Sequence, residues 1–204
     1  WHGNQAMTGL TDFFACLRDC QLPFVLATNN ASLTQQQYID KLANMGVEVV
    51  ADEVLTSSMA TASYLAEHHP ADKRRAFAIG EAGLREPLEA VGFTLTDLYE
   101  VDGNGEQQGA DVVVSGLDRQ LSWDKLATAT IHLNNGAAFY ATNSDTTLPT
   151  ELGDVMGNGG TIAALTAATG VSPVSIGKPE PILYQQALTI LGTTAENTVA
   201  IGDR

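Results

Sequence analysis

A hydroxyl group, an ammonium group and a carboxylate each stand where an apolar segment ends or a helix is about to begin. Thr28 opens a Thr-Asn-Asn run, Thr28 to Asn30, in which the hydroxyl and main-chain N–H groups can face an anion. Lys178 precedes a predicted helix, where the dipole disfavours a cation by roughly 0.3–1 kcal/mol, which indicates an anion in front of it. Asp203 follows an apolar run and suits a hard cation. Because open α/β sheets bind ligands at such positions, we expect Thr28, Lys178 and Asp203 to converge on one cleft.

Each of these residues also has a purely structural interpretation. The segment after Thr28 is compatible with a turn held by Asx-type hydrogen bonds. Lys178 is compatible with a solvated surface lysine, and Asp203 with the N-cap of a following helix. The combination of the three is more specific than any one of them.

Alternating apolar segments of strand and helix type position these residues and predict an α/β fold. Helical periodicity or helix-start signals predict helices over 10–17, 35–45, 60–67, 81–91, 122–133, 160–169 and 181–191. Short apolar runs predict strands or extended segments over 22–27, 47–50, 53–56, 76–80, 111–116, 138–142, 174–176 and 198–201. Thr34 and Gln37 form a predicted capping box, and Ser122 is a predicted N-cap. Pro179, after Lys178, suits a first helical position.

Composition restricts the classes of partner. The 204 residues carry 24 acidic and 10 basic side chains, a formal net charge of −14, which disfavours nucleic-acid binding. No apolar run approaches the roughly 18–20 residues that span a membrane. Only four lysines are present, so Lys178 stands out. Because Cys16 and Cys20 are four apart in a predicted helix, they suggest buried or half-buried free thiols and a cytoplasmic location.

The three motifs together resemble motifs II, III and IV of the haloacid dehalogenase (HAD) phosphatases, in the NagD-like, 4-nitrophenylphosphatase-like branch called subfamily IIA. They are the segment 24–30, the Gly-Lys-Pro-Glu-Pro run at 177–181 and the Val-Ala-Ile-Gly-Asp-Arg run at 199–204. Segments in between, such as 56–62, 79–84 and 141–149, resemble the family too. The resemblance implies a HAD-like Rossmannoid core, a three-layer α/β/α sandwich over 1–75 and 173–204, with an inserted α/β cap domain of the C2 type over 76–172.

The same resemblance implies a Mg²⁺-dependent phosphomonoester hydrolase that forms an aspartyl-phosphate. Thr28 and Asn29 would hold the phosphoryl group, helped by the main chain of Asn30, and Lys178 would contact both nucleophile and phosphate. Asp203 would bind Mg²⁺. The substrate would be a small phosphorylated metabolite, such as a sugar phosphate, a nucleotide, phosphoglycolate or 4-nitrophenyl phosphate, and the protein would contact neither nucleic acid nor membrane. A homodimer formed through the cap is also expected.

Two departures from the family pattern affect these expectations. The family's nucleophile lies in an Asp-x-Asp-Gly segment just upstream of a stretch like 1–3, so the nucleophilic aspartate is expected before Trp1. We therefore expect a sequence cut at both ends, and a polypeptide of 1–204 alone to be inactive and poorly folded. At Leu148 the pyridoxal-phosphate phosphatases have a substrate-contacting histidine, so Leu148 is a substrate-binding candidate that disfavours pyridoxal phosphate.

Two other classes of function compete with this one. The first is a non-catalytic HAD-like binding or interaction protein, which the absence of Asp-x-Asp-Gly before Trp1 would support. The second is a nucleotide-cofactor protein that uses the G-x-G-x-x-A match at 157–163. A dinucleotide fingerprint directly follows a strand, and the residues 151–154 are not strand-like, so a tight turn before a helix is favoured.

Overall fold

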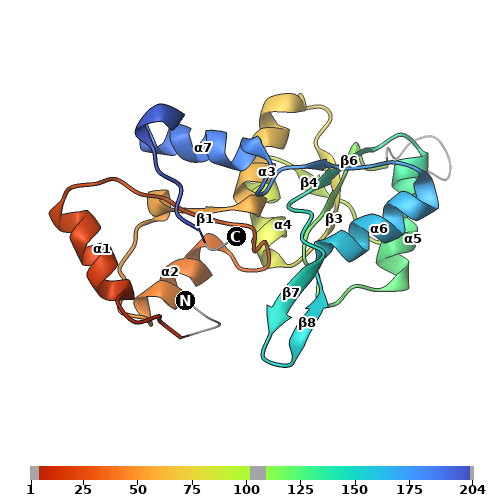
Figure 1. Cartoon of the computed structure of the whole chain (residues 1–204). Helices are drawn as coiled ribbons and strands as arrows, with labels where there is room; N and C mark the ends of the chain where they lie inside the picture. Colours follow the sequence, from red (N-terminus) through yellow and green to blue (C-terminus); the bar gives the residue numbers. More distant parts are fainter. Residues whose placement is uncertain (1–4, 102–108, 203–204) are drawn as a thin grey trace.

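Parallel strands joined by helices organise the computed structural model, which describes residues 5–101 and 109–202 (Figure 1). The larger sheet has the strand order β4-β3-β5-β6-β9, and all of its neighbouring pairs are parallel. Its strands are β3 (Arg75–Ile79), β4 (Thr94–Leu95), β5 (Val112–Ser115), β6 (Ala138–Ala141) and β9 (Val174–Ser175). In the central register, Val112 pairs with Ala76 on one side and Ala138 on the other.

Helices cover both faces of this sheet. The helices α3 (Ser57–His68) and α4 (Ala82–Ala90) share a buried cluster with Ala78 and Val114. The helices α5 (Trp123–Asn134) and α6 (Asn158–Thr169) share another with Phe77 and Val113. Because successive strand residues point to opposite faces, these clusters lie on the two sides of the sheet. The predicted α/β fold with a parallel sheet is therefore confirmed, although this layered sheet lies mostly in the segment 76–172 that was predicted to be the cap rather than in the predicted core.

A smaller part of the chain surrounds a second, two-stranded parallel sheet, in which β1 (Leu26–Thr28) pairs with β2 (Val54–Thr56). The helices α1 (Leu10–Asp19) and α2 (Gln35–Ala43) contribute Phe14, Tyr38 and Leu42 to its core. The remaining elements are α7 (Pro181–Leu191), the antiparallel hairpin β7 (Thr147–Thr150) and β8 (Gly153–Met156), and the 3₁₀ turns η1 (Ala51–Glu53) and η2 (Ala195–Asn197).

Local sequence signals explain where several helices begin. The Thr34 side chain accepts a hydrogen bond from the N–H of Gln37, whose own side chain accepts one from Thr34, so the predicted capping box before α2 is present. Ser122 caps α5 as predicted, through the N–H of Lys125. The helix α7 has Pro181 at its first position, where a proline loses no intrahelical hydrogen bond.

Several local predictions were wrong. No strand forms over 198–201, where Val199 and Ile201 are 83% and 79% exposed, because this segment pairs with no strand within the described residues. The segment 151–154, predicted not to be strand-like, contributes its last two residues to β8. Cys16 and Cys20 are free thiols but exposed rather than buried.

The packing crosses the domain boundaries that the resemblance implies. Ala62 and Leu65 of α3, which fall in the first part of the predicted core, pack in the cluster of the larger sheet. The strand β9, which falls in its second part, pairs with β6. The boundaries after 75 and 172 remain predictions. The five-stranded sheet nevertheless packs against residues before 75 and includes a strand after 172. Within the described residues, no helix is long and apolar enough to cross a membrane.

Candidate functional site

The side chain of Asn29, directly after β1, binds the main chain of Lys178 at two points. Asn29 Oδ1 accepts a hydrogen bond from Lys178 N at 2.7 Å, and Asn29 Nδ2 donates one to Lys178 O at 2.8 Å. Lys178 Nζ donates to the carbonyl of Ala27 at 3.1 Å, which places the ammonium group next to Thr28. The structure therefore brings the Thr28 segment and Lys178 together across 149 sequence positions, counted from Asn29.

The ammonium group of Lys178 is partly buried and has no carboxylate partner within residues 5–101 and 109–202. A half-buried cation that is bonded to only one carbonyl can still donate two hydrogen bonds. The arrangement can therefore bind an anion at the carboxyl end of β1.

A close approach of three segments fixes the loop that carries Lys178. A Cβ atom on Gly177 would lie 2.4 Å from the carbonyl oxygen of Thr142 and 2.7 Å from Asn29 Oδ1, so only glycine fits without a shift. Glu180 is the N-cap of α7, and Pro179 follows a cis peptide bond outside the helix. The interpretation of Pro179 as a first helical residue was therefore wrong, and Lys178 lies in the preceding loop.

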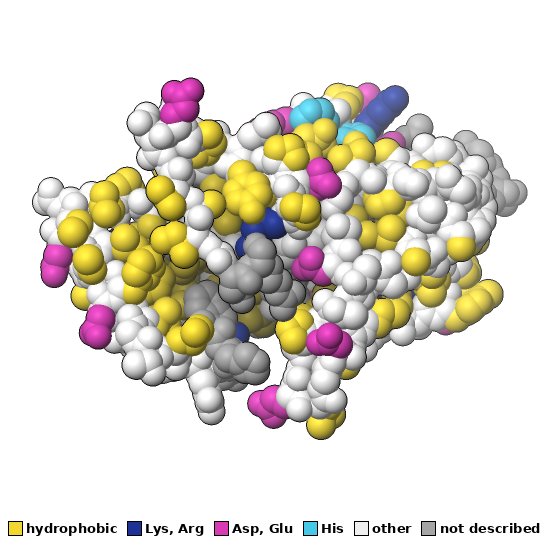
Figure 2. Space-filling model, viewed as in Figure 1, with side chains coloured by type: hydrophobic (Ala, Val, Ile, Leu, Met, Phe, Trp, Pro, Cys, Tyr) yellow, Lys and Arg dark blue, Asp and Glu magenta, His cyan; other side chains and the backbone are white. Residues whose placement is uncertain are grey.

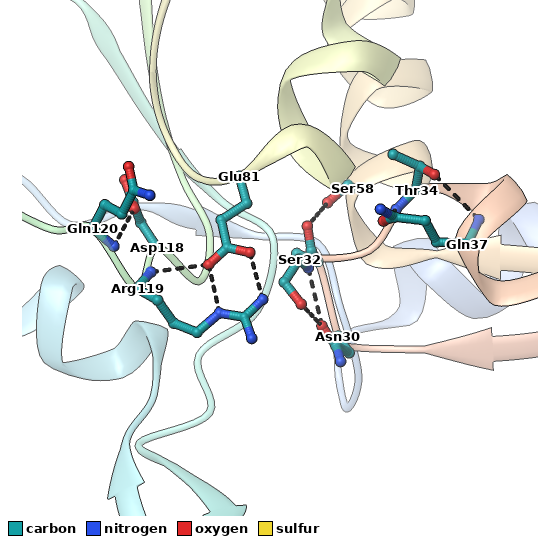
Figure 3. Close-up of polar contacts among 10 residues, drawn as sticks. Asn30, Ser32, Thr34, Gln37, Ser58, Glu81, Asp118, Arg119 and Gln120 are labelled. Carbon is teal, nitrogen blue, oxygen red and sulfur yellow. Dashed lines mark hydrogen bonds and ion pairs between the residues drawn. The ribbon is translucent and has the colours of Figure 1, made fainter. Parts of the chain in front are cut away.

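The turn after Thr28 contains the Asx-type hydrogen bonds of the structural interpretation and also places the Thr28 hydroxyl beside the Lys178 ammonium group. Asn30 N donates to Thr28 Oγ1 at 3.2 Å. Asn30 Oδ1 accepts from Ser32 N at 3.0 Å and from Ser32 Oγ at 2.7 Å (Figure 3). The Asx-type turn is thus present at Asn30. The Thr28 hydroxyl accepts in this turn and also hydrogen-bonds with Tyr38. Because a hydroxyl has one hydrogen, Thr28 donates it to a ligand only by turning it away from Tyr38.

Buried amides support this turn from the side of the larger sheet. Asn143, just after β6, donates to Asn29 O at 2.8 Å, and Ser57 Oγ donates to the same oxygen at 2.9 Å. Asn158, at the start of α6, donates to Asn143 O at 2.7 Å and to Ser115 O at 3.1 Å. Sequence reasoning missed these residues, although the rule that selected Thr28, a polar side chain after an apolar strand, also finds Asn143.

Asp145 is a further residue at the site that sequence reasoning missed. Its Oδ2 atom lies 3.2 Å from Asn29 Nδ2, and its carboxylate is exposed. Leu148 follows on β7, is partly exposed and pairs with Val155 in the hairpin. The described contacts connect the Lys178 site to Asp145 and not to Leu148 itself, so a substrate contact by Leu148 remains a prediction.

Tyr38 lies buried beside the Thr28 turn. Its hydroxyl donates to Asn30 O over a long 3.4 Å, and the side chain is 3% exposed. Burial disfavours the phenolate and raises the pKa of Tyr38 to about 12, while a hydrogen bond with Thr28 acts in the opposite direction. Tyr38 is therefore a neutral support of the turn at physiological pH.

The glycine-rich segment at 157–163 follows a strand, contrary to the sequence prediction, because β8 ends at Met156. That strand belongs to an exposed antiparallel hairpin, whereas a dinucleotide fingerprint joins a strand of a parallel sheet to its helix. A Cβ atom on Gly157 would lie 2.4 Å from Asp145 O. The segment thus packs the hairpin against α6 and presents Asn158.

Metal binding was predicted at Asp203, which lies outside the described residues. Among the residues that the structure does describe, no group of three or more His, Cys, Asp or Glu side chains could hold a metal ion. The carboxylate nearest to Lys178 in the hydrogen-bond network is that of Asp145.

Comparison with known proteins identifies relatives along the whole chain. Family models described as haloacid dehalogenase-like hydrolase match residues 1–94 and 78–204. The 5'-nucleotidase YutF of Bacillus subtilis is 37% identical over 203 residues, which are 100% of this chain and 75% of that protein. An acid sugar phosphatase of Staphylococcus saprophyticus is also 37% identical over 203 residues, with 100% and 74% covered.

A similar solved structure is that of a single mutant of the thermostable NPPase from Geobacillus stearothermophilus. It superposes with a TM-score of 0.88 at 36% identity, over 97% of this chain and 75% of that one. The chain thus spans about three quarters of the length of these relatives, and its α/β architecture is the one they share.

Proposed function

Because the chain belongs to the haloacid dehalogenase-like hydrolase family, in the subfamily IIA branch, we propose that it is a Mg²⁺-dependent phosphomonoester hydrolase of small metabolites. The observation that carries the proposal is the pair of hydrogen bonds between the Asn29 side chain and the main chain of Lys178, which holds the Lys178 ammonium group beside Thr28. A preorganised cation in a partly dry site stabilises the charge of a transferring phosphoryl group.

The contacts suggest a division of labour among the predicted residues. Lys178 Nζ and the Thr28 hydroxyl are placed to donate to phosphoryl oxygens. The hydrogen bonds of the Asn29 side chain go to Lys178 and Asp145, so we propose that this side chain positions Lys178. Its main-chain N–H then remains as its contribution to phosphoryl binding.

The covalent chemistry of the family requires an aspartate that attacks phosphorus. The resemblance assigns it to a segment before Trp1, so the proposal concerns a protein that carries these 204 residues together with that segment. Mg²⁺, with Asp203 as a ligand, would supply further positive charge when bound. Because the described residues do not themselves form a cation site, the roles proposed within them are those of Thr28, Asn29 and Lys178.

The substrate class follows from the relatives. Their names include a 5'-nucleotidase, an acid sugar phosphatase and a nitrophenyl phosphatase, which supports a small phosphorylated metabolite without selecting one. A cytoplasmic location fits such a substrate and remains a proposal, as does a homodimer through the cap.

A phosphate-release assay tests the proposal. The protein is incubated with Mg²⁺ and, separately, 4-nitrophenyl phosphate, glucose 6-phosphate, a nucleoside monophosphate and phosphoglycolate. We expect turnover of at least one compound that a chelator abolishes. Binding of these compounds without phosphate release would support the non-catalytic alternative instead.

A further inference from the structure

The order of the strands places a topological switch point between β3 and β5. The chain leaves β3 through α4 toward β4 on one side, and it leaves β5 through α5 toward β6 on the other. The helices α4 and α5 lie on opposite faces of the sheet. In open parallel sheets, this is where the loops separate and leave a crevice at the carboxyl ends of the strands.

An open cleft of about 600 Å³ occupies this position. Glu81 and Arg85 line it from the turn after β3 and from α4, and Asp118, Arg119 and Lys125 line it from the loop after β5 and from α5. The volume falls in the range of small-molecule sites. No residue that we assigned to phosphoryl transfer lines this cleft.

The cleft concentrates positive charge in an acidic protein. Three of the chain's 10 basic side chains line it, although the net charge is −14. On the face shown in Figure 2, scattered Asp and Glu side chains are more frequent than Lys and Arg. Arg119 pairs with Glu81 at 2.6 Å, and Lys125 pairs with the buried carboxylate of Asp118 at 2.6 Å. The guanidinium of Arg85 has no hydrogen-bond or ion-pair partner within the described residues, which leaves one uncompensated positive charge in the lining.

The cleft lies on the same sheet edge as the Lys178 site. Gly83, at the start of α4, donates from its N–H to Ser32 O at 3.3 Å, so the turn that begins at Thr28 extends to the rim of the cleft. Figure 3 shows the Glu81–Arg119 pair facing the Asn30–Ser32 turn.

We propose that this cleft binds a carboxylate or phosphate group of a small metabolite, with Arg85 as its donor. The Glu81–Arg119 and Asp118–Lys125 ion pairs fix the side chains that line the cleft. Within the part of the chain that the structure describes, the Arg85 guanidinium has unpaired N–H donors, and two of them can bind a carboxylate or phosphate side by side. The anion has two sources: the leaving group of the substrate, in which case the inference rests on the proposed function, or a separate metabolite.

A binding experiment tests the cleft without relying on catalysis. Malonate, a dicarboxylate with no phosphoester, is titrated calorimetrically into the wild-type protein and the Arg85→Gln, Lys178→Ala and Lys73→Gln variants. Lys73 is an exposed lysine outside the cleft, so Lys73→Gln controls for the loss of one charge. We expect Arg85→Gln to weaken malonate binding about tenfold or more, and Lys73→Gln to bind as the wild type does. Because the Lys178 site can itself bind an anion, Lys178→Ala should remove at most a second binding event and leave the Arg85-dependent one in place. Equal affinity in Arg85→Gln, or loss of binding in Lys178→Ala alone, would overturn the assignment.

Kinetics then distinguish the two sources of the anion. kcat/KM is measured for 3-phosphoglycerate, which carries a carboxylate, and for glycerol 1-phosphate, which does not. If the anion belongs to the leaving group, Arg85→Gln lowers kcat/KM selectively for 3-phosphoglycerate. An unchanged ratio together with weakened malonate binding assigns the cleft to a separate anion. If neither ester is hydrolysed and the phosphate-release assay finds no turnover either, the proposed function fails, while the malonate titration still decides whether the cleft binds an anion.

Discussion

Replacing Asn29 tests whether its side chain positions Lys178. Asn29→Ala removes the hydrogen bonds to Lys178 N at 2.7 Å and to Lys178 O at 2.8 Å, and leaves both main-chain groups without these partners. At about 1 kcal/mol for each bond, we expect the free energy of unfolding to fall by about 2 kcal/mol. The 3.2 Å contact with exposed Asp145 adds little.

The effect on catalysis should exceed the effect on stability. A catalytic group displaced by about 1 Å can cost ~10²-fold in rate, and we expect the loop without its two Asn29 hydrogen bonds to let the Lys178 ammonium move that far. We therefore expect kcat to fall ~10²-fold under conditions where the variant is fully folded. Urea denaturation gives the stability, and steady-state hydrolysis of 4-nitrophenyl phosphate gives kcat, both on a protein that carries these residues.

The variant Asn29→Asp provides a matched control. It keeps an acceptor for Lys178 N but turns an oxygen toward Lys178 O and the Asp145 carboxylate, so it should also lose activity while its volume is unchanged. An Asn29→Ala variant that keeps more than half of the wild-type kcat and unfolds within about 0.5 kcal/mol of the wild type would refute the positioning role.

Three further predictions concern the surroundings of the site. Gly177→Ala should destabilise the protein by about 1–3 kcal/mol in denaturant unfolding, because the new Cβ would lie 2.4 Å from Thr142 O; an unchanged midpoint would contradict this packing. The hydrogen bond from Arg119 lowers the pKa of Glu81 below its value in the unfolded chain, which is near ~4.3. The ion pair therefore adds stability, less than about 1 kcal/mol, above that unfolded pKa, and this contribution is lost as the pH falls through the pKa of the folded state. Melts of wild type and Arg119→Gln should therefore differ at pH 7 and coincide near pH 2. Tyr38, whose pKa is raised to about 12, keeps its proton where unfolded tyrosine loses it, so stability should fall as pH rises above ~10, and less so in Tyr38→Phe.

The sequence predicted the elements and the meeting of the motifs better than the details of the site. Each helix from α1 to α7 corresponds to a segment with helical periodicity or to a helix-start signal in the sequence, such as the N-caps Thr34 and Ser122. The approach of Lys178 to Thr28 followed from one rule about the carboxyl ends of parallel strands. These features depend on local patterns or on general sheet topology.

Other features depend on contacts that no local pattern contains. The series of hydrogen bonds from Asn158 through Asn143 to Asn29 joins residues more than 100 positions apart. In the sequence, an asparagine that will be buried looks like an ordinary turn residue, because its partners lie elsewhere in the sequence. Within the described part of the chain, β8 pairs only with β7 and is exposed on both faces, so it lacks the apolar alternation that identifies a strand. Conversely, 198–201 has the apolar pattern of a strand without a paired neighbour in the described structure.

The most direct test of the account is the kcat of Lys178→Ala, measured with Mg²⁺ on a protein that carries these residues and the expected upstream aspartate. The ammonium group beside Thr28 has no ion-pair partner among the described residues, and losing such a donor from a preorganised site costs roughly 3–4 kcal/mol, or ~10²–10³ in rate. We predict a fall of that size with a melting temperature close to that of the wild type. A Lys178→Ala variant that retains more than about half of the wild-type kcat would contradict the proposal that Lys178 takes part in phosphoryl transfer.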